Sequence, residues 1–249
     1  MQTPVFAANW KMNTGPTEAK AFMRSFLTHY ARRPDRTVMF FPSALTFSTL
    51  VDAIKERSDL LLGVQNLHWE DKGAFTGENS AAIAKDAGAR LALIGHSERR
   101  HVFGETDEMQ AKKCAAAVKA GLTPVLCVGE LLAQRDAGKA ESVVIDQLTV
   151  GLSRIEPNQV ATILIAYEPV WAIGTGKTAT PDDATRMHAV IRAYLTRLLG
   201  DKAKAVPILY GGSVNRDNAA TLIAAPEVDG LLVGGASLDA EGWASIVRA

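Results

Sequence analysis

The sequence of 249 residues has little cysteine, no excess of charge of either sign and few aromatic residues. Its two cysteines, Cys114 and Cys127, have neither CxxC spacing nor a neighbouring pair of histidines, which argues against a disulfide framework and a structural zinc site. The 27 Lys and Arg residues balance 27 Asp and Glu residues. Without surplus positive charge, we expect neither nucleic acid nor an anionic membrane as a partner.

Long hydrophobic runs are also missing. Nowhere do 18 apolar residues follow one another, and residues 1–9 do not combine a basic segment with a long apolar one. We therefore predict a cytoplasmic protein. The length fits one large domain and no linker-like tract interrupts it, so we expect a single domain over residues 1–249.

Short apolar runs, rich in β-branched residues, recur along the chain with helix-like stretches between them. Most are nearly continuous in apolar residues, which is typical of strands buried on both faces of a parallel sheet. This order predicts an α/β fold, a (βα)8 TIM barrel of eight parallel strands with outer helices. An open doubly wound sheet is the alternative that the pattern alone leaves. The eight runs are residues 5–9, 38–41, 60–66, 91–95, 124–129, 163–168, 207–211 and 230–234.

Helical spacing of apolar residues follows possible start signals at Thr17, Ser43 and Thr180. At the third, Thr180 would be the N-cap, Pro181 the first helical residue, and Asp183 a carboxylate near the positive end of the helix dipole. We expect a helix to begin there.

Polar residues and glycines gather where the apolar runs end. In a parallel barrel these ends and the loops after them surround one open face, where chemistry concentrates. Each residue alone has an ordinary explanation, such as a solvated lysine, a hydrogen-bonded histidine or a turn glycine. Their shared position indicates a site. They are Asn9, Lys11, His96, Glu168, Gly212, Ser213, Gly234 and Gly235.

The strings around these residues resemble signatures of the triosephosphate isomerase family. They match in the family's order and separations and span residues 8–235, so the resemblance covers essentially the whole chain. It implies an isomerase that interconverts dihydroxyacetone phosphate and D-glyceraldehyde 3-phosphate through an enediol(ate), without cofactor or metal. The strings are residues 8–13 (ANWKMN), 75–78 (FTGE), 95–100 (GHSERR), 166–177 (AYEPVWAIGTGK) and 210–214 (YGGSV).

The resemblance implies roles for four catalytic residues. Glu168 would be the base that moves a proton between adjacent carbons, and His96 would stabilise the enediolate oxygen. This family is itself the standard example of an active site that pairs a carboxylate base with a neutral histidine. An apparent helix start at residue 97 would keep the His96 ring neutral. Lys11 would supply positive charge for the oxyanion and the phosphate, and Asn9 would donate to a substrate oxygen.

Residues around this set would support it. The resemblance places Ser97 and Glu98 beside the histidine, with Glu98 pairing with Lys11 or Arg99. Cys127 matches a family position near the catalytic carboxylate, where we expect a small buried thiol that packs without reacting.

The segment after Glu168 has the composition of a lid, with stiff residues 169–171, a glycine-containing tip and residues 177–179 at its far end. Closure would keep water from an enediolate phosphate. Residues 176–178 mimic the end of a P-loop, but Trp171 stands where the first glycine would be, which argues against a nucleotide site. We expect the main-chain N–H groups of Gly174, Ser213, Gly234 and Gly235 to bind phosphate.

The loop 65–80 carries Trp69 and Phe75 with no obvious element to bury them, which suggests a protein interface. In the family this loop inserts into a second subunit, and Thr76 would support the partner's asparagine and lysine. We therefore expect a homodimer.

Two other functions fit parts of the pattern. Another phosphate-binding barrel enzyme would explain the glycines but not the pairing of Glu168 with His96. A non-catalytic barrel binding protein would have lost a catalytic group, whereas Asn9, Lys11, His96 and Glu168 are all present.

Overall fold

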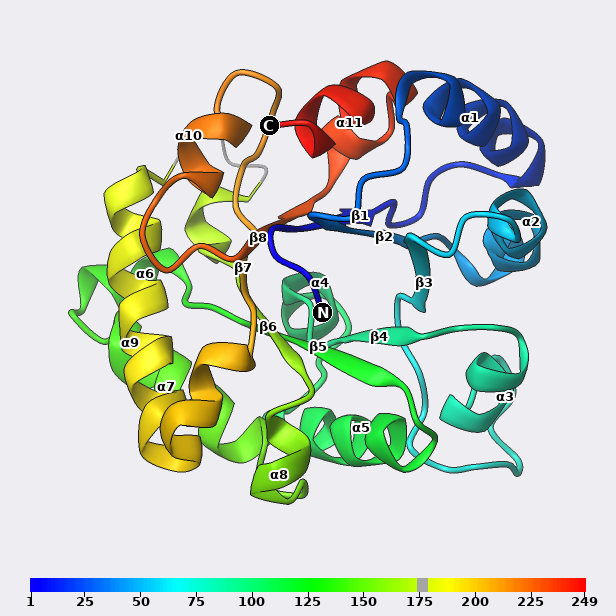
Figure 1. Ribbon diagram of the computed structural model, residues 1–249. Helices are drawn as coiled ribbons and strands as arrows, with labels where there is room; N and C mark the ends of the chain where they lie inside the picture. Colours follow the sequence, from blue (N-terminus) through cyan, green and yellow to red (C-terminus); the bar gives the residue numbers. More distant parts are fainter. Residues whose placement is uncertain (174–178) are drawn as a thin grey trace.

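The computed structural model describes residues 1–173 and 179–249, and within them the strands form one closed parallel barrel (Figure 1). Neighbours in the barrel are neighbours in the chain, and β8 closes the circle by pairing with β1. The predicted barrel is confirmed and the doubly wound alternative is wrong. The strands are β1 Val5–Asn9, β2 Thr37–Phe41, β3 Leu60–Val64, β4 Leu91–Ile94, β5 Thr123–Val128, β6 Leu164–Tyr167, β7 Ile208–Tyr210 and β8 Gly230–Val233.

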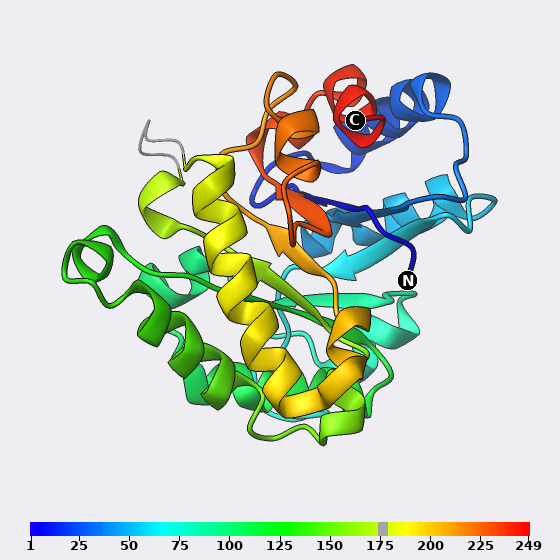
Figure 2. The same cartoon turned by 60° about the vertical axis from the view of Figure 1, so that its left-hand side comes forward.

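Helices surround the strands, and Figure 2 shows the long helix α9 running across the outside of the barrel. No helix in the described part of the chain is long and apolar enough to cross a membrane. The α-helices are α1 Pro16–His29, α2 Ala44–Ile54, α3 Ala81–Asp86, α4 Ser97–His101, α5 Asp107–Lys119, α6 Leu132–Asp136, α7 Ala140–Gly151, α8 Pro157–Val160, α9 Pro181–Leu199, α10 Ala219–Ile223 and α11 Ala240–Val247. Short 3-10 helices are η1 Val170–Ala172, η2 Gly200–Ala205 and η3 Gly235–Ser237.

Of the predicted helix starts, the one at Thr180 is confirmed and the one at Thr17 is not. At α9 the Thr180 side chain accepts a hydrogen bond from the Asp183 N–H, as predicted. The start at Thr17 is wrong: α1 begins at Pro16 with Gly15 as its N-cap. The Glu18 carboxylate accepts from the Gly15 N–H, so it satisfies this end of the helix from inside the first turn.

Apolar side chains fill both sides of the strands, which explains the continuous apolar runs. Along β1, Val5 and Ala7 belong to the cluster inside the barrel, while Phe6 and Ala8 belong to the cluster between strands and helices. The barrel interior is therefore packed, and space for a ligand remains at its open end.

The loop 65–80 leaves the body of the protein and returns. Residues 71–79 are exposed, and the loop is closed at its base, where the His68 N–H donates to the Asn79 carbonyl over 2.8 Å. Phe75 is 44% exposed, as expected. Trp69 is not: it is half-buried, stacked on His68 and covered by the Lys112 ammonium. Neighbours from α5, which local sequence does not reveal, give it this cover.

Candidate active site

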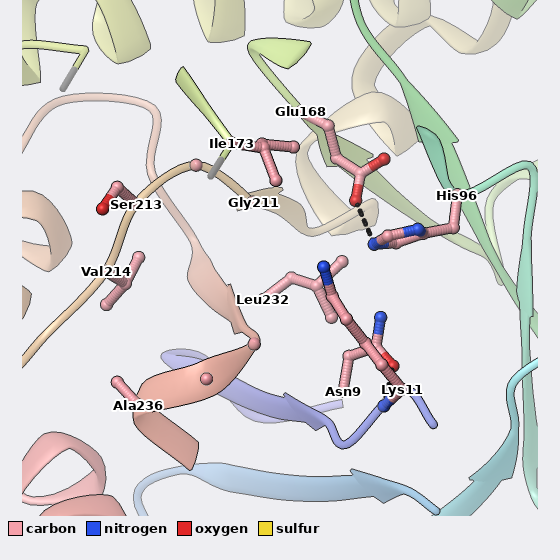
Figure 3. Close-up of a pocket in the computed structure, with 13 residues that line it drawn as sticks. Asn9, Lys11, His96, Glu168, Ile173, Gly211, Ser213, Val214, Leu232 and Ala236 are labelled. Atoms are coloured by element: carbon pink, nitrogen blue, oxygen red, sulfur yellow. Dashed lines mark hydrogen bonds and ion pairs between the residues drawn. The ribbon is translucent and has the colours of Figure 1, made fainter. Parts of the chain in front are cut away.

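A cavity of about 320 Å³ opens at the carboxyl ends of the strands (Figure 3). It brings together Asn9, Lys11, His96 and Glu168 from β1, β4 and β6 with the glycine-rich turns after β7 and β8. The gathering of these residues at one rim agrees with the sequence-based expectation, although the role of each stays a prediction. The lining residues are Asn9, Lys11, His96, Glu168, Ile173, Gly211, Gly212, Ser213, Val214, Leu232, Gly234, Gly235 and Ala236.

Glu168 and His96 contact each other at the cavity wall, as Figure 3 shows. Glu168 Oε1 lies 3.0 Å from His96 Nε2, and Glu168 Oε2 accepts a 2.8 Å hydrogen bond from the Ser97 N–H. Glu168 is 2% exposed. Both carboxylate oxygens are thus engaged in contacts within the protein.

The other ring nitrogen of His96 indicates the tautomer. His96 is the N-cap of α4, and its Nδ1 accepts from the Glu98 N–H over 3.3 Å. A nitrogen that accepts carries no proton, so a neutral ring has its proton on Nε2, the atom that points into the cavity toward Glu168. The helix start expected at residue 97 therefore acts on the His96 ring through one main-chain N–H, that of Glu98.

The two side chains perturb each other's ionisation. Burial raises the pKa of Glu168, but the His96 ring, the Ser97 N–H and Lys11 outweigh burial and hold this pKa below its usual value. For His96, burial lowers the pKa, but the facing Glu168 carboxylate outweighs it and raises the pKa. When Glu168 turns away or takes up a proton, its charge no longer raises the pKa of His96. Burial and Lys11 then favour the neutral imidazole.

Lys11 leads from the end of β1 into the cavity. Its backbone has φ 52°, and its N–H donates to Asn9 Oδ1 over 3.0 Å. The Gln65 side chain donates to the Lys11 carbonyl over 2.8 Å, which ties this strained residue to the end of β3. Lys11 Nζ pairs with Glu98 at 2.7 Å. Glu98 thus pairs with the first of the two partners expected for it.

The other possible partner of Glu98 is engaged elsewhere. Arg99 Nη2 lies 2.6 Å from Glu105, and Lys113 Nζ also bonds to Glu105. Arg99 therefore pairs with Glu105 instead of Glu98.

The opposite side of the cavity offers main-chain N–H groups. In residues 1–173 and 179–249, the N–H groups of Ser213, Gly234 and Gly235 have no hydrogen-bond partner. The carbonyls are held, since Asn218 donates to the Ser213 carbonyl and Ser237 to the Gly234 carbonyl. Free N–H groups of residues that line one cavity can bind an anion. Gly174, the fourth residue expected here, lies outside the described residues.

Residues 174–178 of the expected lid, which include Lys177, also lie outside the described residues. The described part, residues 169–173, contains the short helix η1. Trp171 Nε1 donates to Glu130 over 2.8 Å, and Tyr167 bonds to the same buried carboxylate. The backbone after Glu168 is therefore anchored at its start.

Cys127 lies in the barrel interior at the end of β5 and is fully buried. Burial raises its pKa well above the usual value, and the Glu168 charge adds to this effect. A thiol that stays protonated is inert as a nucleophile, which agrees with the expected packing role. Cys127 and Cys114 are both unpaired.

Several lining residues had no distinctive signal in the sequence. Leu232 is one of many apolar strand residues, and only the closed barrel turns its side chain toward the cavity. Ile173 and Val214 are apolar residues of loops, and Ala236 lies in the 3-10 helix η3. The run of small residues 211–213 is the one sequence signal that predicts further lining residues, because small residues after a strand allow close approach of a ligand.

Metal ligation has no obvious place in the described residues. Within 1–173 and 179–249, no group of three or more His, Cys, Asp or Glu residues could hold a metal ion. The chemistry that the cavity supports is proton transfer between a carboxylate, an imidazole and a bound molecule, with an ammonium and free N–H groups available for negative charge.

Comparison with known proteins yields a family and close relatives. The family model described as triosephosphate isomerase matches residues 4–249. A triosephosphate isomerase of Roseiflexus sp. is 48% identical over 249 residues, which covers 100% of this chain and 98% of the relative. Those of Solibacter usitatus and Chloroflexus aurantiacus are 47% and 48% identical over the whole chain and cover 100% and 99% of their own lengths.

Proposed function

The chain belongs to the triosephosphate isomerase family, and we propose that Glu168 and His96 perform its reaction, the interconversion of dihydroxyacetone phosphate and D-glyceraldehyde 3-phosphate. The observation that carries this assignment is the buried pair of Glu168 Oε1 and His96 Nε2, 3.0 Å apart, at the wall of a cavity with free N–H groups. The enzyme is an intramolecular aldose–ketose isomerase.

Glu168 is the base in this mechanism. Once substrate occupies the cavity, the carboxylate turns from His96 and Ser97 to the carbon next to the carbonyl and takes its proton, leaving an enediolate. The same carboxyl then returns the proton to the neighbouring carbon. Burial in a pocket with little water raises the basicity of the released carboxylate, because a desolvated charge gains more from binding a proton.

His96 and Lys11 stabilise the negative charge that develops on the substrate oxygens. The Nε2–H of neutral His96, released by Glu168, donates to an oxygen of the enediolate, while the Glu98 N–H holds Nδ1 in the accepting state. Lys11 contributes a positive charge, and its pairing with Glu98 holds the ammonium in place. Asn9 both accepts from the Lys11 N–H and presents its amide to the cavity.

Phosphate binding falls to the main chain after β7 and β8. The unpaired N–H groups of Ser213, Gly234 and Gly235 support this role. Lys11 is close as well: a Cβ built on Gly234 would lie 3.4 Å from Lys11 Cε. The ammonium can therefore act on the phosphate and on the developing oxyanion together.

The direct test is a coupled assay with D-glyceraldehyde 3-phosphate as substrate. We expect turnover that is unchanged by EDTA, since the proposed chemistry uses no metal. Absence of turnover at enzyme concentrations up to micromolar would refute the assignment and favour a barrel that only binds phosphate compounds.

We also propose a homodimer in which the loop 65–80 of each copy docks beside the other's Lys11. A second cavity of about 190 Å³ lies there and is lined in part by Lys11, Met12, Gln65 and Phe103. Met12 is 96% and Phe103 63% exposed in the single chain, which leaves two apolar side chains for the exposed Phe75 and Thr76 of a second copy to cover. A single species near 26.6 kDa in analytical ultracentrifugation at micromolar concentration would contradict it.

The proposed location is the cytoplasm. Triose phosphates are doubly charged and do not cross membranes unaided, so their isomerase acts in the compartment where they are made and used. Fractionation of the source cells with an antibody to this chain tests this proposal.

A further inference from the structure

The carboxyl end of β5 lies between the strands that carry the two reacting side chains. His96 follows β4 and Glu168 follows β6, and β5 lies between these strands and pairs with both. The Glu168 N–H donates to the Val128 carbonyl over 2.8 Å, just beyond the last pair of the ladder. The distance between the base and the histidine therefore depends on where the end of β5 lies.

One side chain from helix α7 binds the main chain just after β5. Gln147 of α7 is 8% exposed and binds both main-chain groups of the buried Gly129. Its Oε1 accepts from the Gly129 N–H over 2.7 Å, and its Nε2 donates to the Gly129 carbonyl over 3.1 Å. Gly129 in turn touches the base: a Cβ built on it would lie 1.7 Å from the Glu168 carbonyl oxygen. A shift of Gly129 therefore moves the backbone of Glu168.

A second side chain performs the same task on the histidine side. Arg100 Nε donates to the Gly95 carbonyl over 2.7 Å, and Arg100 Nη2 donates to the Cys127 carbonyl over 2.9 Å. Gly95 directly precedes His96 and has φ 72°. The guanidinium, which is 7% exposed and also pairs with Asp107, thus joins the start of the His96 turn to the end of β5.

We propose that Gln147 and Arg100 are positioning residues that set the separation of His96 and Glu168 through the carboxyl end of β5. Neither side chain lines the cavity, so neither acts on the substrate directly. Buried main-chain groups at the ends of strands need partners, and here each side chain binds two main-chain atoms. The inference rests on the proposed isomerase reaction, because a fixed separation matters most for proton transfer: a misplacement of about 1 Å costs on the order of 10²-fold in rate.

The test replaces Gln147 by Met, which keeps the volume and removes both hydrogen bonds. We expect kcat to fall about 10- to 100-fold, while KM and the inhibition constant of inorganic phosphate stay within about 3-fold. If Gln147→Met does not fold, Gln147→Glu has the same size and at neutral pH loses the donor to the Gly129 carbonyl; its expected fall in kcat is smaller. The matched control is Leu148→Ala, which removes a fully buried side chain of the same helix without touching Gly129. It should lower stability and leave kcat unchanged.

Arg100→Lys tests the histidine side, because one ammonium cannot bind both carbonyls in the geometry of the fork. We expect kcat to fall about 10-fold, and the double variant to lose less than the product of the two single losses, since both act on one separation. A kcat within 2-fold of the parent in Gln147→Met, or an equal loss in Leu148→Ala, would overturn the proposal.

Nitrogen NMR of the His96 ring separates this inference from the proposed reaction. The Nε2 signal reports the contact with Glu168 without any turnover, and we expect it to shift in Gln147→Met and Arg100→Lys but not in Leu148→Ala. If the two variants show these shifts but the parent chain has no isomerase activity, the proposed function is wrong and the positioning role stands. An active parent with an unchanged signal in both variants would sink the positioning role alone.

Discussion

The two sides of the cavity are built in opposite ways. On the side of β4, β5 and β6, long side chains from behind the rim bind the main chain, as Gln147 does at Gly129 and Arg100 at Gly95. On the side of β7 and β8, short side chains after the strands hold carbonyls, and the N–H groups of lining residues stay unpaired within the described residues.

This difference matches what each side is asked to do. Proton transfer needs two side chains at a defined distance, so the main chain that carries them is bound at several atoms. Binding of an anion needs free donors at close approach, so the main chain there is glycine-rich and its N–H groups are left open. Changes on the first side should therefore act on kcat, and changes on the second on KM.

The largest effect is expected from Glu168→Asp. Shortening the side chain withdraws the carboxylate by about one carbon–carbon bond from the substrate carbon, and we expect kcat to fall about 10³-fold with little change in the melting temperature. The coupled assay and a thermal melt measure the two quantities. Unaltered turnover would show that Glu168 is not the base, and the proposed link between this side of the cavity and kcat would fail.

Gly129→Ala should have the next largest effect. The added Cβ would meet the Glu168 carbonyl oxygen, so one backbone must move, and we expect kcat to fall about 10²-fold with a smaller change in KM. The control is Gly15→Ala, where no atom lies within 4 Å of the new Cβ and kcat should stay the same. Equal kcat in both variants would show that the separation tolerates a shift of the main chain.

Gly235→Ala probes the other side of the cavity. Its Cβ has no neighbour within 4 Å, so the fold should accept it, but the methyl group restricts the approach of a phosphate to the N–H groups. We expect KM to rise about 10-fold and kcat to change less than about 3-fold. A loss in kcat with constant KM would reverse the division between the two sides.

The smallest effect on turnover is expected at the boundary between the sides, where His188 packs between Tyr167 at the end of β6 and Tyr210 at the end of β7. Burial lowers the pKa of His188 to about 4 from 6.5. Between these values the unfolded chain binds a proton that the folded chain does not, so stability is full above about pH 6.5 and falls as the pH drops toward 4.

His188→Gln should abolish this share of the pH dependence, which amounts to roughly 3 kcal/mol between pH 7 and 4. Urea denaturation of both proteins at several pH values measures it. Parallel stability curves for the parent and the variant would contradict the assigned cause, while turnover near pH 7 should differ little between them.

The sequence predicts a large share of the fold because parallel strands buried on both faces leave a plain pattern. All eight expected runs contain or overlap a strand, and the deviations are at the ends. The run 60–66 shortens to β3 Leu60–Val64, and beyond its end the Gln65 side-chain amide donates to the carbonyls of Lys11 and Phe41.

Composition and order along the chain determined which residue types stand at the ends of the strands, and with them the barrel and the type of chemistry at its rim. Only the closed barrel decided which atoms meet. Glu98 pairs with Lys11 instead of Arg99, Trp69 is covered by α5, and a glutamine in the middle of α7 holds the main chain beside the base. The physical reason is that periodicity reports which face of an element is buried, whereas hydrogen-bond partners far apart in the chain are selected by three-dimensional packing.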